Sequence, residues 1–149
     1  MKIIVDTNIV FSAMLNSNSR IGKIILNSKE HFQFFSCNYL QVEIHRHRNK
    51  LLKLTKLTED HLSELESLVT QKITFIDERL IPKDLLVKTE IQLKTIDPND
   101  TVFVALTKQL EGKLWTGDMQ LYNGLKAKRF KDIILTSELS LLLDDLERG

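Results

Sequence analysis

Five acidic side chains occupy positions that a solvated helix surface does not explain: Asp6, Glu43, Asp97, Asp100 and Asp118. Asp6 and Asp118 each follow a short apolar run, and Asp97 and Asp100 frame a turn that precedes an apolar helix. Glu43 lies one turn into another predicted helix. Taken singly, an aspartate at a strand-to-helix junction is better explained as an N-cap, which contributes about 1 kcal/mol to a helix.

Taken together, these carboxylates indicate a metal site. Carboxylates within about 4–6 Å of one another repel and raise each other's pKa, so such a cluster stays ionised only when cations neutralise it. Mg²⁺ typically binds to a few carboxylates, waters and substrate phosphate. An acidic pocket that repels phosphate by itself then becomes a phosphate site once metal is bound.

The elements that must position these acids alternate along the chain. Short apolar runs predict strands at residues 2–5, 32–36, 73–76, 113–116 and 133–135. Helical spacing and capping residues predict helices at 9–15, 21–26, 38–52, 58–69, 82–95, 100–110, 119–126 and 136–146. Asn38, Thr58 and Thr136 are the expected N-caps, and Gly112 is expected to end its helix. This order predicts an α/β fold with a parallel sheet and helices on both faces, whose ligand site lies at the carboxyl ends of the strands.

Composition narrows the class further. The 149 residues are 42% apolar and 28% charged, which suits one packed domain over residues 1–149 and excludes disorder as the main state. The single cysteine, Cys37, cannot form an internal disulfide. No apolar run has the length of a secretory signal or a membrane span, so we expect a soluble cytoplasmic protein with no membrane partner. A formal net charge of +1 means that a polyanion must be held by a local patch or by metal ions.

The ordered set of motifs resembles the PIN domain of metal-dependent ribonucleases. It comprises Ile3–Val10 with Asp6, a helical Glu43, the turn Asp97–Asp100 and Thr116–Asp118. More narrowly, the chain is similar to the small prokaryotic PIN proteins that act as toxins in toxin–antitoxin modules. The resemblance covers almost the whole length. It implies a three-layer α/β/α architecture with the central parallel strands in the order 3-2-1-4-5.

The resemblance also implies a site and a reaction. Asp6, Glu43, Asp100 and Asp118 would form an acidic quartet that binds Mg²⁺ or Mn²⁺ and is catalytic, with Asn8, Thr116 and Asp97 in supporting positions. The implied activity is that of an endoribonuclease, in which a metal-activated water hydrolyses the RNA phosphodiester and leaves a 5′-phosphate. The implied partners are an RNA substrate, a cognate antitoxin protein and a second copy of the chain in a homodimer.

Positive side chains concentrate in two segments, at residues 45–50 and 126–131. One reading is a solvated helix surface and a charged loop, and the other is contact with phosphates on either side of the site. Under the second reading the RNA-binding candidates are Arg46, Arg48, Lys50, Lys128 and Arg129.

Several other functions remain open at this point. One is a non-catalytic PIN module that binds RNA or protein, which the full set of acids disfavours. Another is an RNA-processing nuclease with no toxin role. A phosphohydrolase with Asp6 as nucleophile fits poorly, because Thr7 and Asn8 follow where a second acid or a threonine arrangement is expected. A nucleotide-binding fold is disfavoured because no glycine-rich phosphate loop follows the first strand.

Overall fold

A computed structural model describes residues 1–149. Five parallel strands form one sheet in the order β3-β2-β1-β4-β5, which confirms the predicted strand order. The strands are β1 (Lys2–Val5), β2 (Gln33–Cys37), β3 (Ile73–Ile76), β4 (Lys113–Trp115) and β5 (Ile133–Ile134). β1 lies at the centre and pairs with β2 on one side and β4 on the other. The strand order reverses at β1, which is where an open α/β sheet forms its ligand crevice.

Nine α-helices surround the sheet. They are α1 (Thr7–Leu15), α2 (Arg20–Asn27), α3 (Tyr39–Arg46), α4 (Arg48–Thr55), α5 (Glu59–Thr70), α6 (Lys83–Leu93), α7 (Thr101–Leu110), α8 (Met119–Ala127) and α9 (Thr136–Arg148). Two short 3₁₀ helices, η1 (Glu78–Leu80) and η2 (Pro98–Asp100), precede α6 and α7. None of the helices combines the length and apolar character needed to cross a bilayer.

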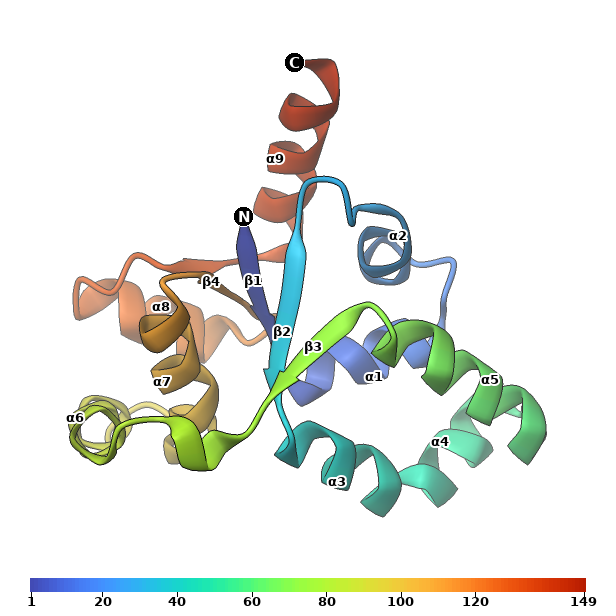
Figure 1. Ribbon diagram of the computed structural model, residues 1–149, viewed down its shortest axis with the longest axis horizontal. Coiled ribbons are helices and arrows are strands. Elements are labelled where there is room, and N and C mark those ends of the chain that lie inside the picture. Colours follow the sequence, from blue (N-terminus) through green and yellow to red (C-terminus); the bar gives the residue numbers. More distant parts are fainter.

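Alternating side chains of β1 build two cores, one on each face of the sheet. Ile3 and Val5 join the larger core with α1 to α5 and α9, whereas Ile4 joins the smaller core with α6, α7 and α8. Figure 1 shows the resulting three layers, with the sheet between the two groups of helices. Such burial on both faces explains why the strands are continuous apolar runs.

One predicted helix is wrong in its extent. Residues 38–52 form two helices, because the chain bends at His47, where φ is −98° and ψ is 14°. Ile44 of α3 and Leu51 of α4 both pack in the larger core, so the bend keeps both helices against α1. Asn38 makes no capping hydrogen bond with its side chain, so its predicted capping role is also wrong.

The capping residues of two further helices differ from the prediction. Helix α7 ends at Leu110 as predicted, but the left-handed residue that caps it is Glu111, with φ of 56°, and not Gly112. Gly112 is required for a different reason, since a Cβ there would lie 2.7 Å from the carbonyl oxygen of Lys2. Its lack of a side chain lets β4 start close beside β1. At the last helix, Leu135 occupies the N-cap position in place of Thr136, and its backbone N–H donates to Glu138.

Candidate metal centre

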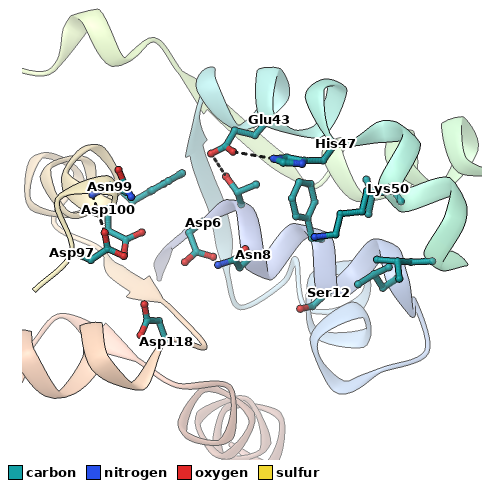
Figure 2. A pocket seen from close by; sticks show the side chains of 16 residues that line it. Asp6, Asn8, Ser12, Glu43, His47, Lys50, Asp97, Asn99, Asp100 and Asp118 are labelled. Atoms are coloured by element: carbon teal, nitrogen blue, oxygen red, sulfur yellow. Dashed lines mark hydrogen bonds and ion pairs between the residues drawn. The ribbon is translucent and has the colours of Figure 1, made fainter.

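A pocket of about 600 Å³ lies at the carboxyl ends of β1 and β4. Sixteen residues line it, and all five acids singled out from the sequence are among them. Figure 2 shows the aspartates grouped at one end of this pocket and the side chains of α1 and α4 at the other. The predicted crevice at the centre of the sheet is therefore present.

Asp6 sits directly after β1 as the N-cap of α1. Its Oδ1 accepts a hydrogen bond of 3.0 Å from the backbone N–H of Ile9, and its side chain is almost fully buried. Burial is the main reason that the pKa of Asp6 is raised to about 6, and the negative charge of Asp118 raises it further. The cap uses one carboxylate oxygen, so the other remains available to a ligand.

Asp118 follows β4 and caps α8 in the same way. Its Oδ1 accepts hydrogen bonds from the backbone N–H groups of Gln120 and Leu121, at 2.9 and 3.2 Å. Its own N–H donates to Oγ1 of the buried Thr116, at 3.0 Å. Thr116 thus fixes the backbone from which the Asp118 carboxylate projects.

Asp97 and Asp100 reach the pocket from the turn before α7. Asp97 accepts a hydrogen bond of 3.0 Å from the N–H of Asn99 and begins η2, whereas Asp100 caps nothing with its side chain. The pKa of Asp100 is raised to about 7, mainly by burial and then by the charges of Asp6 and Asp97. Asp97, Asp100 and Asp118 each offer a carboxylate oxygen within 4.8 Å of the others.

This donor set suits a hard divalent cation. Oxygen ligands from carboxylates are those that Mg²⁺ and similar ions prefer. Burial is the main cause of the raised pKa of Asp6 and of Asp100, and neighbouring negative charges add to it. A bound cation would offset these charges and favour the ionised carboxylates. The residues therefore fit a metal ion.

Glu43 stands apart from this group. Its Oε1 accepts a hydrogen bond of 3.4 Å from Thr7, and its Oε2 lies 3.8 Å from Nε2 of His47. In Figure 2, Asp6 lies between Glu43 and the three clustered aspartates. The structure thus brings Asp97 into the tightest group of acids, where the sequence had placed it in a supporting position, and it leaves Glu43 at the opposite side of Asp6.

Only one of the basic candidates lines the pocket. Lys50 does so together with Asn8, as Figure 2 shows. Arg48 faces α5 instead, where its guanidinium donates to Glu66 and to the carbonyl of Glu59.

The other three basic candidates lie outside the pocket. Arg46 is engaged with Tyr39, and Lys128 donates to the carbonyl of Gln92. Arg129 follows the end of α8 in left-handed backbone. The expected basic flanks on both sides of the cleft are therefore not assembled around the pocket.

Some lining residues were missed in the sequence. Phe11, Ser12, Leu15 and Leu54 line the pocket from α1 and α4. The three from α1 share with Asn8 the spacing i, i+3, i+4 and i+7, which places them on one face of the helix. That spacing was a usable signal for a face, but only the fold shows that the face borders the acids.

Comparisons with known proteins agree with this architecture. A family model described as PIN domain matches residues 4–138. No match was found among curated protein sequences. A solved structure of VapBC2 from Rickettsia felis, bound to a DNA fragment from their promoter, contains a similar chain, with a TM-score of 0.66 and 14% identity. The match covers 91% of this chain and 97% of that one, and at this identity it shows a common fold. Since the family model spans most of the chain, including Asp6, Glu43, Asp97, Asp100 and Asp118, the protein belongs to the PIN domain family.

Proposed function

We propose that this protein is a Mg²⁺- or Mn²⁺-dependent endoribonuclease that acts in the cytoplasm as the toxin of a toxin–antitoxin pair. The observation that carries the proposal is the convergence of three carboxylate oxygens within 4.8 Å of one another, beside the buried Asp6. PIN domains are generally nucleases, and the family membership of the chain supports the reaction class.

The acids divide into ion-binding and supporting residues in the proposed reaction. Asp97, Asp100 and Asp118 would hold the ion, and Asp6 would add negative charge beside them. When bound, a divalent ion lowers the pKa of a water and offsets charge on the phosphate. The backbone hydrogen bonds to Asp6 and Asp118 keep their carboxylates in place, so little reorganisation is needed when substrate binds.

Glu43 acts from the other side of Asp6. The contacts with Thr7 and His47 hold its carboxylate facing the pocket. From there it orients water or a substrate hydroxyl by hydrogen bonding. Asn8 lies at the rim, where its amide can donate to a phosphate oxygen.

The partner proposal has a different basis. The similar chain in the Rickettsia felis structure belongs to VapBC2, which was solved with a promoter DNA fragment. We propose by analogy that the present chain binds a cognate antitoxin protein and that it forms a homodimer.

The decisive experiment incubates the purified protein with a panel of structured and unstructured RNAs. Each reaction is run with Mg²⁺, with Mn²⁺ and with EDTA, beside the variants Asp6→Asn and Asp118→Asn. Both variants retain a side-chain oxygen that can cap the following helix, so their folds are preserved. Loss of cleavage in EDTA and in both variants is expected, because metal-assisted stabilisation is worth several kcal/mol, or about 100-fold in rate. Cleavage that persists under all of these conditions contradicts the proposal.

The toxin role is tested separately. Expression of the protein is expected to arrest growth. We also expect a small open reading frame immediately adjacent to its gene, whose co-expression relieves the arrest. The Asp118→Asn variant should not arrest growth. Normal growth with a wild-type protein that cleaves RNA in vitro favours a role in RNA processing instead.

A further inference from the structure

The pocket continues beyond the acids into a furrow between α1 and α4. Phe11, Ser12 and Leu15 line it from α1, and Lys50, Leu51 and Leu54 line it from α4. From Asn8 to Leu15, α1 advances about 10 Å at 1.5 Å per residue, which is room for one nucleotide beyond the acids. We call this part of the pocket the α1–α4 furrow.

The walls of the α1–α4 furrow are apolar and open to water. Leu15 and Leu54 keep 42% and 58% of their surface exposed, and Phe11 is half-buried. The ring of Phe11 packs edge to face against His47, with 5.6 Å between the centroids and 82° between the planes. This contact orients the phenyl ring, which also lines the pocket.

Polar groups without protein partners accompany this wall. Lys50 forms no ion pair, and the side chains of Asn8 and Ser12 make no hydrogen bond. Figure 2 shows the Lys50 side chain reaching from α4 toward α1, on the side of Asn8 and Ser12. A positive charge for the phosphate and an aromatic side chain for the base are the features that proteins use to bind single-stranded nucleic acids. The free hydrogen-bonding groups of Asn8 and Ser12 lie beside them.

We propose that the α1–α4 furrow binds the nucleotide adjacent to the scissile phosphate, with its base against Phe11 and Leu54 and its phosphate at Lys50. The proposal rests on the nuclease function above and specifies its substrate. A base can enter the furrow only when it is unpaired and unstacked, so the substrate is single-stranded RNA at that position. Charge favours this occupant, since Lys50 pairs with a phosphate.

The test begins with an RNA that the wild-type protein cleaves at one mapped bond. Two analogues replace either the nucleotide before or the nucleotide after that bond by an abasic residue. One abasic analogue is expected to be cleaved about tenfold more slowly, because base–aromatic stacking is lost. The other analogue, and a control with an abasic residue four positions away, should be cleaved at the normal rate.

Variants then connect that base to the furrow. Phe11→Leu and Leu54→Ser should slow cleavage of the intact RNA. Each variant should cleave the intact RNA and the abasic analogue at similar rates, because the contact between the base and the furrow is already lost. Leu68→Ser is the matched control for Leu54→Ser, because Leu68 is 52% exposed on α5 and lies outside the pocket. In a plot of the logarithm of RNA affinity against the logarithm of salt concentration, Lys50→Gln should reduce the steepness of the slope by about one. The surface variant Lys88→Gln should leave that slope unchanged. Leu54→Ser and Lys50→Gln alter exposed side chains and are expected to fold even if Phe11→Leu does not.

Failure of this proposal is distinguishable from failure of the nuclease function. If RNA is cleaved but neither abasic analogue is slowed, the furrow does not bind a base and the nuclease function stands. If both single-stranded and fully paired RNA are cleaved equally, the furrow proposal is likewise overturned. If no RNA is cleaved, binding of a fluorescein-labelled 12-nucleotide RNA of random sequence decides, by anisotropy in Mn²⁺. If Leu54→Ser and Lys50→Gln bind this RNA at least about fivefold more weakly than the wild type, the result supports the furrow proposal. If the wild type and the variants bind it equally, or none of them binds it, the proposal is overturned. Another occupant, such as an apolar peptide, is then favoured.

Discussion

Asp6 and Asp118 leave two neighbouring parallel strands at the same edge of the sheet, each as the N-cap of the helix that follows. The negative charge of Asp118 raises the pKa of Asp6, which burial has already raised. The two aspartates therefore stabilise local structure and oppose each other electrostatically at the same time. The capping function that explains each aspartate singly also fixes it where a cation can bind.

Removing one charge should stabilise the metal-free protein at neutral pH. The pKa of the Asp6 carboxyl is about 6 in the folded state and has its ordinary, lower value in the unfolded state. The carboxyl therefore stays protonated up to a higher pH when the protein is folded. Between about pH 4 and 6 the folded state therefore binds more protons, so stability falls as pH rises. We expect Asp6→Asn to be more stable than the wild type by about 3 kcal/mol at pH 8 in EDTA, and equal to it near pH 4. Urea unfolding at both pH values measures this difference, and a variant less stable at pH 8 contradicts it.

Divalent ions should stabilise the folded protein through the aspartate cluster. An ion at 100 times its Kd stabilises by about 2.7 kcal/mol, and thermal unfolding with Mn²⁺ or EDTA detects this. The increase in Tm should be larger at pH 7.5 than at pH 5, since protons compete for Asp6 and Asp100 at the lower pH.

Asp97→Asn and Asp144→Asn form a matched pair for that measurement. Asparagine at position 97 can still accept the hydrogen bond from Asn99, so the turn is kept while a charge is removed. We expect Asp97→Asn to weaken the Mn²⁺-dependent increase in Tm, and the exposed Asp144→Asn to leave it unchanged. If Mn²⁺ raises the Tm of Asp97→Asn as much as that of the wild type, Asp97 does not bind the ion and serves only to stabilise the turn.

Thr116 should affect activity through the position of Asp118. Replacing it by Val preserves the side-chain shape but removes the oxygen that accepts the hydrogen bond from the Asp118 N–H. Loss of one such bond is worth about 1 kcal/mol, so we expect cleavage to slow by roughly fivefold. Thr116→Ser keeps the hydroxyl and should retain most of the rate. Circular dichroism melts of both variants separate this positioning effect from a loss of folded protein.

Arg48 should contribute to stability and not to RNA affinity. Its side chain is mostly buried against α5, where it donates to Glu66, Ser63 and the carbonyl of Glu59. We expect Arg48→Gln to lower the free energy of unfolding by about 1 kcal/mol. The slope of log affinity for RNA against log salt concentration should stay unchanged in this variant. A slope that is less steep by about one would show that Arg48 contacts an RNA phosphate.

Much of the fold followed from local signals. Apolar runs such as Ile3–Val5 and Ile73–Ile76 indicate buried strands, and Thr58 caps its helix as predicted. The helix boundary at His47 could not be predicted in this way. No glycine or proline marks it, and the bend is set by how α3 and α4 pack against α1.

The sequence by itself determined which residue types were available for chemistry and at which strand ends they stand. Acids after β1 and β4 must meet because parallel neighbouring strands present their carboxyl ends at one edge. Only the tertiary structure decided which acids are closest. It brought Asp97 beside Asp100 and Asp118, left Glu43 across the pocket with His47, and turned Arg48 away from it. Such distances depend on how distant segments pack, and local sequence patterns carry no information about that packing.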